Sequence, residues 1–378
     1  MRTRDLGISI GLGRPGPDNA ITDVPGVKVG HATIITGDGP LVVGQGPVRT
    51  GVTVVVPPDP DGTNAPVFAG CHRLNGNGEL TGLEWVRESG LLTGPVAITN
   101  THSVGVVRDA LVAVSVERAA DRVAWSLPVV GETYDGVLND INGFHVRAAH
   151  LRAALETARG GPVQEGGVGG GTGMICHEFK GGIGTASRVV PADRGAHTVG
   201  VLVQANYGKR AWLRVDGVPV GAEITVDEVP SAWGTVRAVD AAAPPPGTGS
   251  IIVVLATDAP LLPHQCERVA QRAGLGIARA GGTGGHTSGD LFIAFATGNR
   301  LPPDDDVHGT PGYDVHVAGD GVVDALFDAA IEATEEAIIN ALVAAETMTG
   351  RDGITAHALP HDRLLEVMTR YGRGPRVA

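Results

Sequence analysis

Residues 240–256 read DAAAPPPGTGSIIVVLA and join the most irregular part of the chain to one of the most regular. The first ten residues contain three prolines and two glycines, so no helix or central strand continues through them. After Ser250 the run is continuously apolar, which is typical of a strand buried on both faces. The sequence therefore predicts an exposed linker over residues 240–249 that ends abruptly on a buried strand at Ser250.

Strand and helix patterns lie on both sides of this linker. Buried strands are predicted where short apolar runs occur, over residues 52–56, 95–100, 198–205 and 291–297. Helices are predicted where apolar positions recur at spacings of three and four, over residues 104–119, 146–159, 263–280 and 320–347. No internal repeat is visible. The pattern predicts one α/β layered domain over residues 1–378, built from two segments that share a core.

The composition is that of a globular protein rich in glycine, with 42% hydrophobic residues, 19% charged residues and 57 glycines. So many glycines predict tight turns and close approaches of the backbone. No apolar stretch reaches the roughly 18 residues of a membrane span, and the start lacks a leader-peptide pattern, so we expect a cytoplasmic protein with no membrane partner. The net charge of -12 argues against nucleic acid as a partner.

Cysteine and motif content exclude several kinds of site. Three widely spaced cysteines, Cys71, Cys176 and Cys266, fit reduced buried thiols better than disulfides or a zinc site. Glycines at positions 11, 13 and 16 match the dinucleotide-binding spacing, but Pro15 and Pro17 prevent the helix that this motif must open. No H-E-x-x-H or P-loop motif occurs. We expect no metal and no organic cofactor.

The junction between Gly249 and Ser250 has the features that self-cleavage needs. A serine hydroxyl can attack the preceding glycine carbonyl, and glycine tolerates the backbone conformation that such an attack requires. Hydrolysis of the resulting ester would leave Ser250 with a free α-amine, whose usual pKa of about 7.7–8.0 suits a general base for its own hydroxyl. The alternative is a strand that simply begins with serine, since Gly-Ser is common at loop ends.

Five other polar positions are candidates for chemistry. Ser288 and Asp290 lie two apart in an extended, glycine-rich segment and so point to the same side. Asn206 follows a predicted strand, where its amide can donate to a developing oxyanion. Glu132 and Tyr134 belong to the acidic segment ETYDGVLNDI at residues 132–141. Such segments more often satisfy their own backbone, and a structural turn is likewise the alternative for Ser288 and Asp290.

Several separated motifs, in this order along most of the chain, resemble the DmpA-type family of L-aminopeptidases/D-esterases and the related β-peptidyl aminopeptidases. The motifs are ITDVPGVKVGH (21–31), TNTHSVG (99–105), ETYDGVLNDI (132–141), GGGTGM (169–174), VQANYG (203–208), GSIIVVLATDAPLLPHQ (249–265) and SGD (288–290). The resemblance implies a four-layer α/β/β/α sandwich that cuts itself at Gly249–Ser250. The products would be an α-chain of residues 1–249 and a β-chain of residues 250–378, assembled as a homotetramer of such pairs.

The resemblance also implies roles for single residues. Ser250 is the nucleophile, helped by Ser288 and by Asp290, which stands where the β-peptidyl members have Glu. The remaining residues that match family positions are Asn206 at the oxyanion, Tyr134 in the catalytic site and Glu132 on the free amine of the substrate. The implied reaction releases N-terminal amino acids from short peptides, amino-acid amides or esters through an acyl-enzyme on Ser250.

Three alternatives stay open at this stage. Within the family, the substrate could be a β-peptide. Acyl transfer of the ornithine-acetyltransferase type shares the layered fold and self-processing, although that family usually presents Thr as the new N-terminus and this chain presents Ser250. A non-catalytic binding or assembly protein that has kept the fold would remain uncut.

Overall fold

The computed structural model describes residues 1–59, 65–119, 125–239, 249–303 and 311–375. Of the predicted linker at 240–249, all but Gly249 lies outside the described residues. The strand predicted to follow it is present as β11 (Ser250–Thr257), and all eight of its residues are buried.

Two sheets form the centre of the molecule. One has four strands in the order β1 (Lys28–Thr36), β2 (Val48–Val56), β5 (Val96–Asn100) and β6 (Val129–Thr133). The other has six, in the order β4 (Leu91–Leu92), β3 (Val67–Gly76), β12 (Gly289–Ala296), β11, β10 (Thr198–Asn206) and β9 (Gly182–Val189). The two strands that follow the 240–249 segment, β11 and β12, thus lie in the middle of the larger sheet, between strands that precede it.

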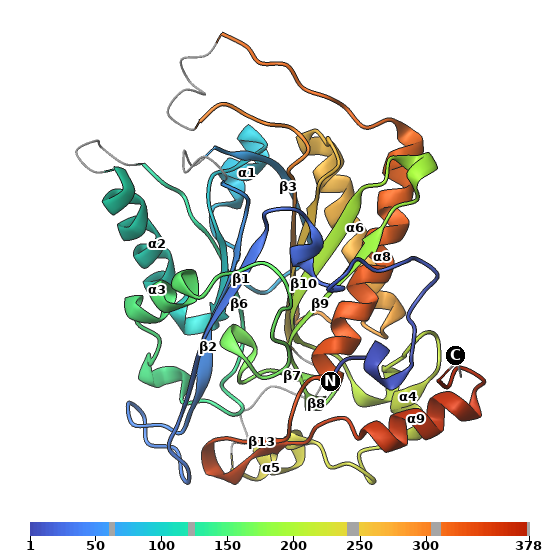
Figure 1. Cartoon of the computed structure of the whole chain (residues 1–378). Coiled ribbons are helices and arrows are strands. Elements are labelled where there is room, and N and C mark those ends of the chain that lie inside the picture. The colour runs from blue at the N-terminus through green and yellow to red at the C-terminus, as the bar shows by residue number, and fades with distance from the viewer. Residues whose placement is uncertain (60–64, 120–124, 240–248, 304–310, 376–378) are drawn as a thin grey trace.

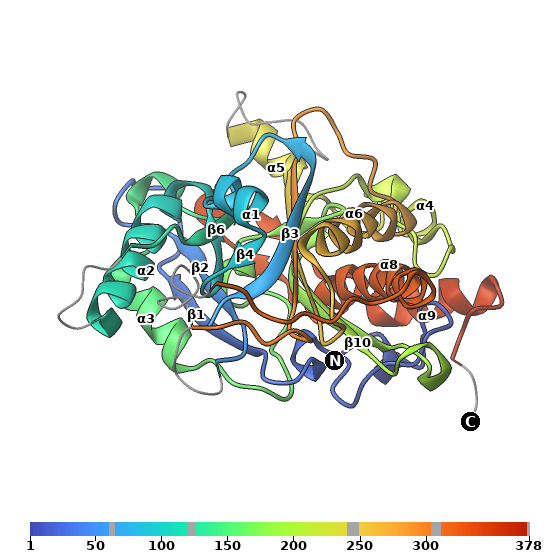
Figure 2. The ribbon, with the colours of Figure 1, turned by 90° about the horizontal axis from the view of Figure 1, so that it is seen from above.

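Helices cover the outer face of each sheet. α2 (Val104–Ala119) and α3 (Ala148–Glu156) pack on the four-stranded sheet. α6 (Pro263–Arg279) and α8 (Asp320–Val343) pack on the six-stranded sheet. Figure 1 shows the resulting order of layers, and Figure 2 shows it from above: helices, sheet, sheet, helices. The prediction of a four-layer α/β/β/α sandwich is confirmed.

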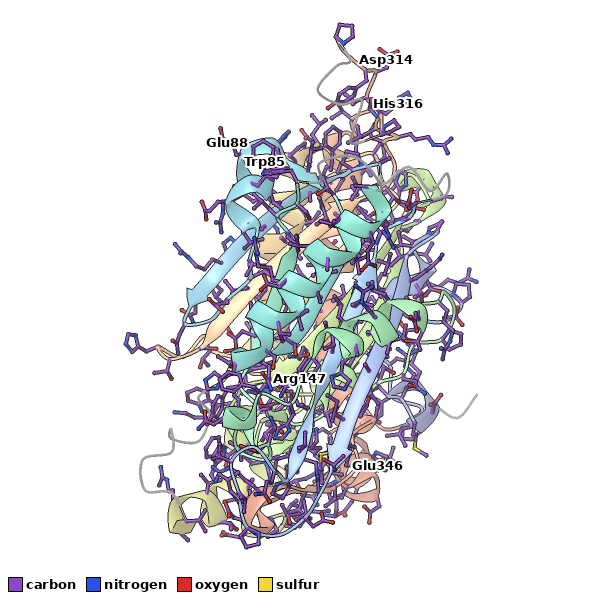
Figure 3. The ribbon with its side chains drawn as sticks, turned by 90° about the vertical axis from the view of Figure 1, so that its left-hand side faces the viewer. Trp85, Glu88, Arg147, Asp314, His316 and Glu346 are labelled. Carbon is purple, nitrogen blue, oxygen red and sulfur yellow. The ribbon has the colours of Figure 1, made fainter. Side chains whose placement is uncertain are left out.

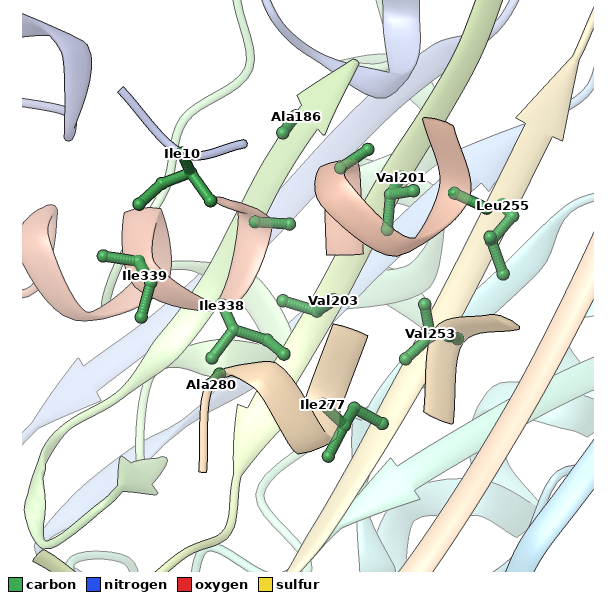
Figure 4. Packing of buried hydrophobic residues seen from close by; sticks show 14 of the residues in the cluster. Ile10, Ala186, Val201, Val203, Val253, Leu255, Ile277, Ala280, Ile338 and Ile339 are labelled. Atoms are coloured by element: carbon green, nitrogen blue, oxygen red, sulfur yellow. The ribbon is translucent and has the colours of Figure 1, made fainter. Parts of the chain in front are cut away.

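β11 shows why the sequence of a central strand is apolar without interruption. Ile251, Val253 and Leu255 face the core under α6 and α8, part of which is drawn in Figure 4. Ile252 and Val254, on the other face, belong to the core between the two sheets. Because successive side chains of a strand point to opposite faces, burial on both faces removes the polar alternation.

Glycine allows the layers to approach closely. A Cβ atom placed on Gly184 in β9 would lie 1.9 Å from the carbonyl oxygen of Ala337 in α8, so no other residue fits there without moving the helix. The three cysteines are free and buried, as the sequence predicted.

Shorter elements complete the chain. The short α-helices are α1 (Leu83–Ser89), α4 (Val220–Glu223), α5 (Ala232–Val239) and α9 (His361–Arg370), and the short strands are β7 (Ile175–Cys176), β8 (Phe179–Lys180), β13 (Met348–Thr349) and β14 (Thr355–Ala356). The 3-10 turns are Arg4–Leu6, Ile21–Asp23, Thr101–Ser103, Ile141–Gly143, Gly169–Gly171, Ala192–Arg194, Arg210–Trp212 and Arg351–Gly353. β7, β8 and α5 lie toward the same end of the sandwich (Figure 1). No helix in the described part of the chain is both long enough and apolar enough to cross a membrane.

The predicted elements are present, with differences at their ends. The helix predicted to start at residue 146 begins at Ala148, because Arg147 has extended backbone angles (φ −132°, ψ 164°). Figure 3 shows Arg147 on the α2–α3 face, and Asp314 and His316 at the far end, on the segment that leads to α8. The helix predicted over residues 320–347 ends at Val343.

Candidate active site

The sheet topology brings three candidate residues to one edge. Ser250 is the first residue of β11 and pairs with Asn206, the last residue of the antiparallel strand β10. The parallel neighbour β12 begins beside them, with Asp290 opposite Ile251. Residues 206, 250 and 290 are therefore neighbours because of strand order and direction, although they are distant in sequence.

Ser250 is buried and tightly enclosed. Its Oγ accepts a hydrogen bond from the backbone N–H of Gly289 at 3.1 Å. Gly249, to which it is joined by a peptide bond, has no room for a side chain, since a Cβ atom there would lie 1.9 Å from the carbonyl oxygen of Asn206. Glycine before Ser250 is thus a steric requirement of this site.

Ser288 and Asp290, which the spacing predicted on one side of the segment, form a hydrogen-bonded pair. The Ser288 hydroxyl donates to Asp290 Oδ1 at 2.5 Å, and Asn75 Nδ2 in β3 donates to Oδ2 at 3.1 Å. Burial raises the pKa of the Asp290 carboxyl, while these two hydrogen bonds act in the opposite direction. Among the described residues, no hydrogen bond joins Ser288 to Ser250, and the closest link between the pair and the candidate nucleophile is the intervening Gly289.

The amide of Asn206 is held in one orientation. Its Oδ1 accepts from the N–H of Ile175 at 2.8 Å, and its Nδ2 donates to the carbonyl of Tyr134 at 2.9 Å. One of the two Nδ2 protons is left for a ligand in the adjacent cavity. Tyr134 supports Asn206 through its backbone, while its ring, 37% exposed, lies against Gly136.

Glu132 is a buried carboxylate whose hydrogen-bond donors are both neutral. The N–H of Glu79 donates to Oε1 at 3.0 Å, and the hydroxyl of Thr101 donates to Oε2 at 2.5 Å. No Arg or Lys side chain in the described residues forms an ion pair with it. Burial raises the pKa of Glu132, and the two hydrogen bonds and the charge of His102 oppose that rise without cancelling it. The arrangement is suited to a cation supplied by a ligand.

These residues line one cavity of about 610 Å³. Its walls consist of Asn77, Gly78, Glu79, Thr101, Glu132, Tyr134, Val137, Ile175, Glu178, Asn206, Gly208, Trp233, Gly249, Ser250 and Thr287. A cavity of this size takes a dipeptide or a small amide. No group of three or more metal-ligating side chains was found in the described part of the chain.

Sequence reasoning missed some of this site and misjudged one segment. Asn75 was not singled out, and Thr101 and Gly289 were noted only as parts of motifs. In the 132–141 segment, the backbone of residues 138 and 139 does bond back to Asp135, as expected of a turn. Glu132 instead lies on β6, with its carboxylate in the cavity wall.

A candidate serine nucleophile at the start of a central strand, inside a four-layer sandwich, defines a hydrolase of the N-terminal nucleophile type. Residues 19–356 match the model of Peptidase family S58, so the chain belongs to that family. Over 375 residues it is 51% identical to the β-peptidyl aminopeptidase BapA of Sphingosinicella microcystinivorans, covering 98% of this chain and 93% of the relative.

Solved structures agree with this assignment. The β-aminopeptidase of a Burkholderia species superposes with a TM-score of 0.89 at 57% identity, covering 98% of this chain and 99% of that one. The L-aminopeptidase D-Ala-esterase/amidase of Ochrobactrum anthropi, described as a variant of the Ntn hydrolase fold, gives 0.89 at 47% identity, covering 98% and 99%. The predicted function, a self-processing serine aminopeptidase, is confirmed at the level of the family.

Proposed function

We propose that this chain cuts itself between Gly249 and Ser250 and then acts as an aminopeptidase with Ser250 as the nucleophile. In the first step, Ser250 Oγ attacks the Gly249 carbonyl carbon, and the bond to Ser250 N breaks as that nitrogen takes up a proton. Water then hydrolyses the ester, giving a carboxylate on Gly249 and a free α-amine on Ser250. Residues 1–249 and 250–378 remain together because strands and helices of both share one core.

The freed α-amine is the general base in the second reaction. It accepts the proton of Ser250 Oγ as this oxygen attacks the first amide carbonyl of a bound substrate. Asn206 Nδ2 stabilises the oxyanion, which is worth about 3 kcal/mol for one well-placed donor. When the tetrahedral intermediate collapses, the Ser288–Asp290 pair relays this proton from the α-ammonium of Ser250 to the leaving amine, which restores the base. Water completes the turnover by hydrolysing the acyl-enzyme.

Glu132 is the observation that carries the aminopeptidase proposal. Burial of this carboxylate is unfavourable, and the charge of nearby His102, with which it forms no ion pair, offsets only part of the cost, since the pKa of Glu132 stays raised. A protonated substrate amine bound between Glu132 and Ser250 supplies that charge and places the first carbonyl at the nucleophile. The proposed substrates are therefore short peptides, amino-acid amides or esters with a free amine.

We propose that the substrates include peptides and amides whose N-terminal residue is a β-amino acid. The support is the names of two relatives, one 51% and one 57% identical, which are a β-peptidyl aminopeptidase and a β-aminopeptidase. The test is a comparison of kcat/KM for β-alanyl, L-alanyl and D-alanyl anilides. Hydrolysis of the L-alanyl compound alone would contradict the β-peptidyl part.

Intact mass under denaturing conditions tests the cleavage. The 38.6 kDa chain should give pieces of roughly 25 and 13 kDa, with Ser250 as a new N-terminus. The Ser250→Ala variant should give one uncut chain and lose activity by about 10⁴-fold or more. A wild-type chain that stays whole yet hydrolyses amides would refute the proposed base.

We also propose a cytoplasmic homotetramer of cut pairs. The family resemblance supports the tetramer. Three unpaired buried cysteines support a location in the cytoplasm, which is a reducing compartment. Light scattering coupled to size-exclusion chromatography tests the first, and cell fractionation tests the second.

A further inference from the structure

The cavity has two ends, which lie on opposite sides of Ser250. Glu132 belongs to one end, because its carboxylate bonds the N–H of Glu79 and a Cβ atom on Gly78 would lie 2.9 Å from its Oε1. Gly78 in turn approaches Gly289, at the start of β12. The strand order from this end is β12, β11 with Ser250, then β10.

The other end of the cavity is formed by the β7–β8 hairpin. It is attached to the end of β10, since the N–H of Ile175 donates to Asn206 and the N–H of His177 donates to the carbonyl of Tyr207 at 2.6 Å. Glu178 lines the cavity here. A substrate with its amine at Glu132 and its carbonyl at Ser250 thus extends its leaving group toward Glu178.

The turn of this hairpin has an unusual sequence. Cys176 pairs with Phe179, so the loop consists of His177 and Glu178 alone, with φ of 47° and 63°. A two-residue turn with positive φ at both positions favours Asn-Gly or Asp-Gly. Each non-glycine residue in this region costs on the order of 1 kcal/mol. Turn geometry does not account for a glutamate here, so its side chain needs another explanation.

The Glu178 carboxylate has no ion pair within the described residues. Its Oε1 accepts only from the backbone N–H of Arg210, at 3.0 Å. The Arg210 guanidinium is directed elsewhere: it donates to carbonyl oxygens, including that of Glu178, and stacks on Phe179. The positive charge of Arg210 stabilises the Glu178 carboxylate at a distance, but the guanidinium forms no ion pair with it.

Apolar side chains stand beside this carboxylate. Val137, Ile175 and Trp233 form part of one hydrophobic cluster and also line the cavity. No Lys, Arg or His is among the described lining residues, whereas three glutamates are. An apolar wall next to a carboxylate fits a side chain with a hydrocarbon stem and a cationic head.

We infer that Glu178 selects substrates whose leaving-group residue carries such a side chain, as lysine, ornithine or arginine do. This inference rests on the proposed aminopeptidase function. In this inference Glu178 determines specificity. It lies on the side of Ser250 opposite to Glu132, which binds the substrate amine.

A matched pair of dipeptide amides tests the inference. Both have the same first residue, and the second is lysine in one and norleucine, which keeps the stem without the charge, in the other. The cut enzyme should favour lysine in kcat/KM by about five- to tenfold, and 0.5 M NaCl should reduce this preference. Glu178→Gln, which retains the acceptor for Arg210, should bring the ratio close to one.

Two further variants control the test. Glu79→Gln changes a carboxylate at the amine end and should keep the lysine preference. Glu178→Asn suits positive φ and should fold even if the Gln variant does not, again with a ratio near one. A wild-type ratio near one, or a lysine preference that survives removal of Glu178, would overturn the inference. If neither peptide is cleaved, the proposed function itself is wrong.

Discussion

Two buried glutamates occupy opposite electrostatic surroundings. Glu336 in α8 pairs with Arg188 at 2.6 Å and Arg4 at 2.8 Å, and Asn19 also donates to it. Glu132 receives only neutral donors. Both side chains are almost fully excluded from solvent, with exposed fractions of 0% and 3%.

The difference separates structural charge from functional charge. At Glu336 the cations come from the segment before the cleavage site and the carboxylate from the segment after it, so the cluster joins the two segments. Burial without an ion pair, as at Glu132, is a stability cost that folding alone does not explain. We therefore assign the first cluster to assembly of the fold and the second to binding.

The largest expected effect comes from breaking the paired cluster. Glu336→Gln removes the negative charge that offsets the buried positive charge of Arg188. It should lower the free energy of unfolding by about 3–5 kcal/mol, measured by urea denaturation. Activity per folded molecule should be retained. Glu228→Gln, which breaks the exposed pair with Arg363, is the matched control and should change stability far less. Equal losses in both variants would contradict the distinction.

The pH dependence should report the unpaired carboxylate. Protonation of the Ser250 α-amine, the general base, should lower kcat/KM by about tenfold per pH unit below its pKa. An ammonium substrate also needs ionised Glu132, so the fall should steepen by a further factor of about ten per pH unit below the raised pKa of this group. In Glu132→Gln this steepening should disappear, and the limb of the α-amine should remain. An unchanged profile in the variant would remove Glu132 from substrate binding.

A smaller effect is expected at Asn75. Removing its hydrogen bond to Asp290 in Asn75→Ala should lower kcat by about five- to tenfold with little change in KM, because the amine site is intact. Asn77→Ala removes a bond to the carbonyl of Thr287 from the same loop region and serves as control. A comparable loss of kcat in both variants would mean that the effect is structural.

The smallest effect should have the opposite sign to that at Glu336. The pKa of Glu132 is raised, so its ionised form costs folding free energy above that pKa, and the cost vanishes as the pH falls below the unfolded value. Glu132→Gln should therefore raise the free energy of unfolding at pH 7, by up to about 1 kcal/mol. A clear loss of stability would contradict this sign.

Local sequence patterns predicted the strands and helices that form the layers, because burial on one or both faces leaves a periodic signal. The spacing of Ser288 and Asp290 likewise predicted that their side chains lie on one side of the segment, where they form a hydrogen bond. Asn75 could not be found in this way, since it meets Asp290 only because β3 lies beside β12, 215 residues apart in sequence. Glu132 was assigned its role by resemblance, whereas the local pattern favoured a turn.

The most direct test of the central claim is a double cycle between Glu132 and the substrate amine. The kcat/KM values of an amino-acid anilide and its N-acetyl derivative are measured with wild type and with Glu132→Gln. We predict that wild type prefers the free amine by at least about 30-fold and that the variant loses most of this preference. An equal preference in both enzymes would contradict the assignment of Glu132 to the substrate amine.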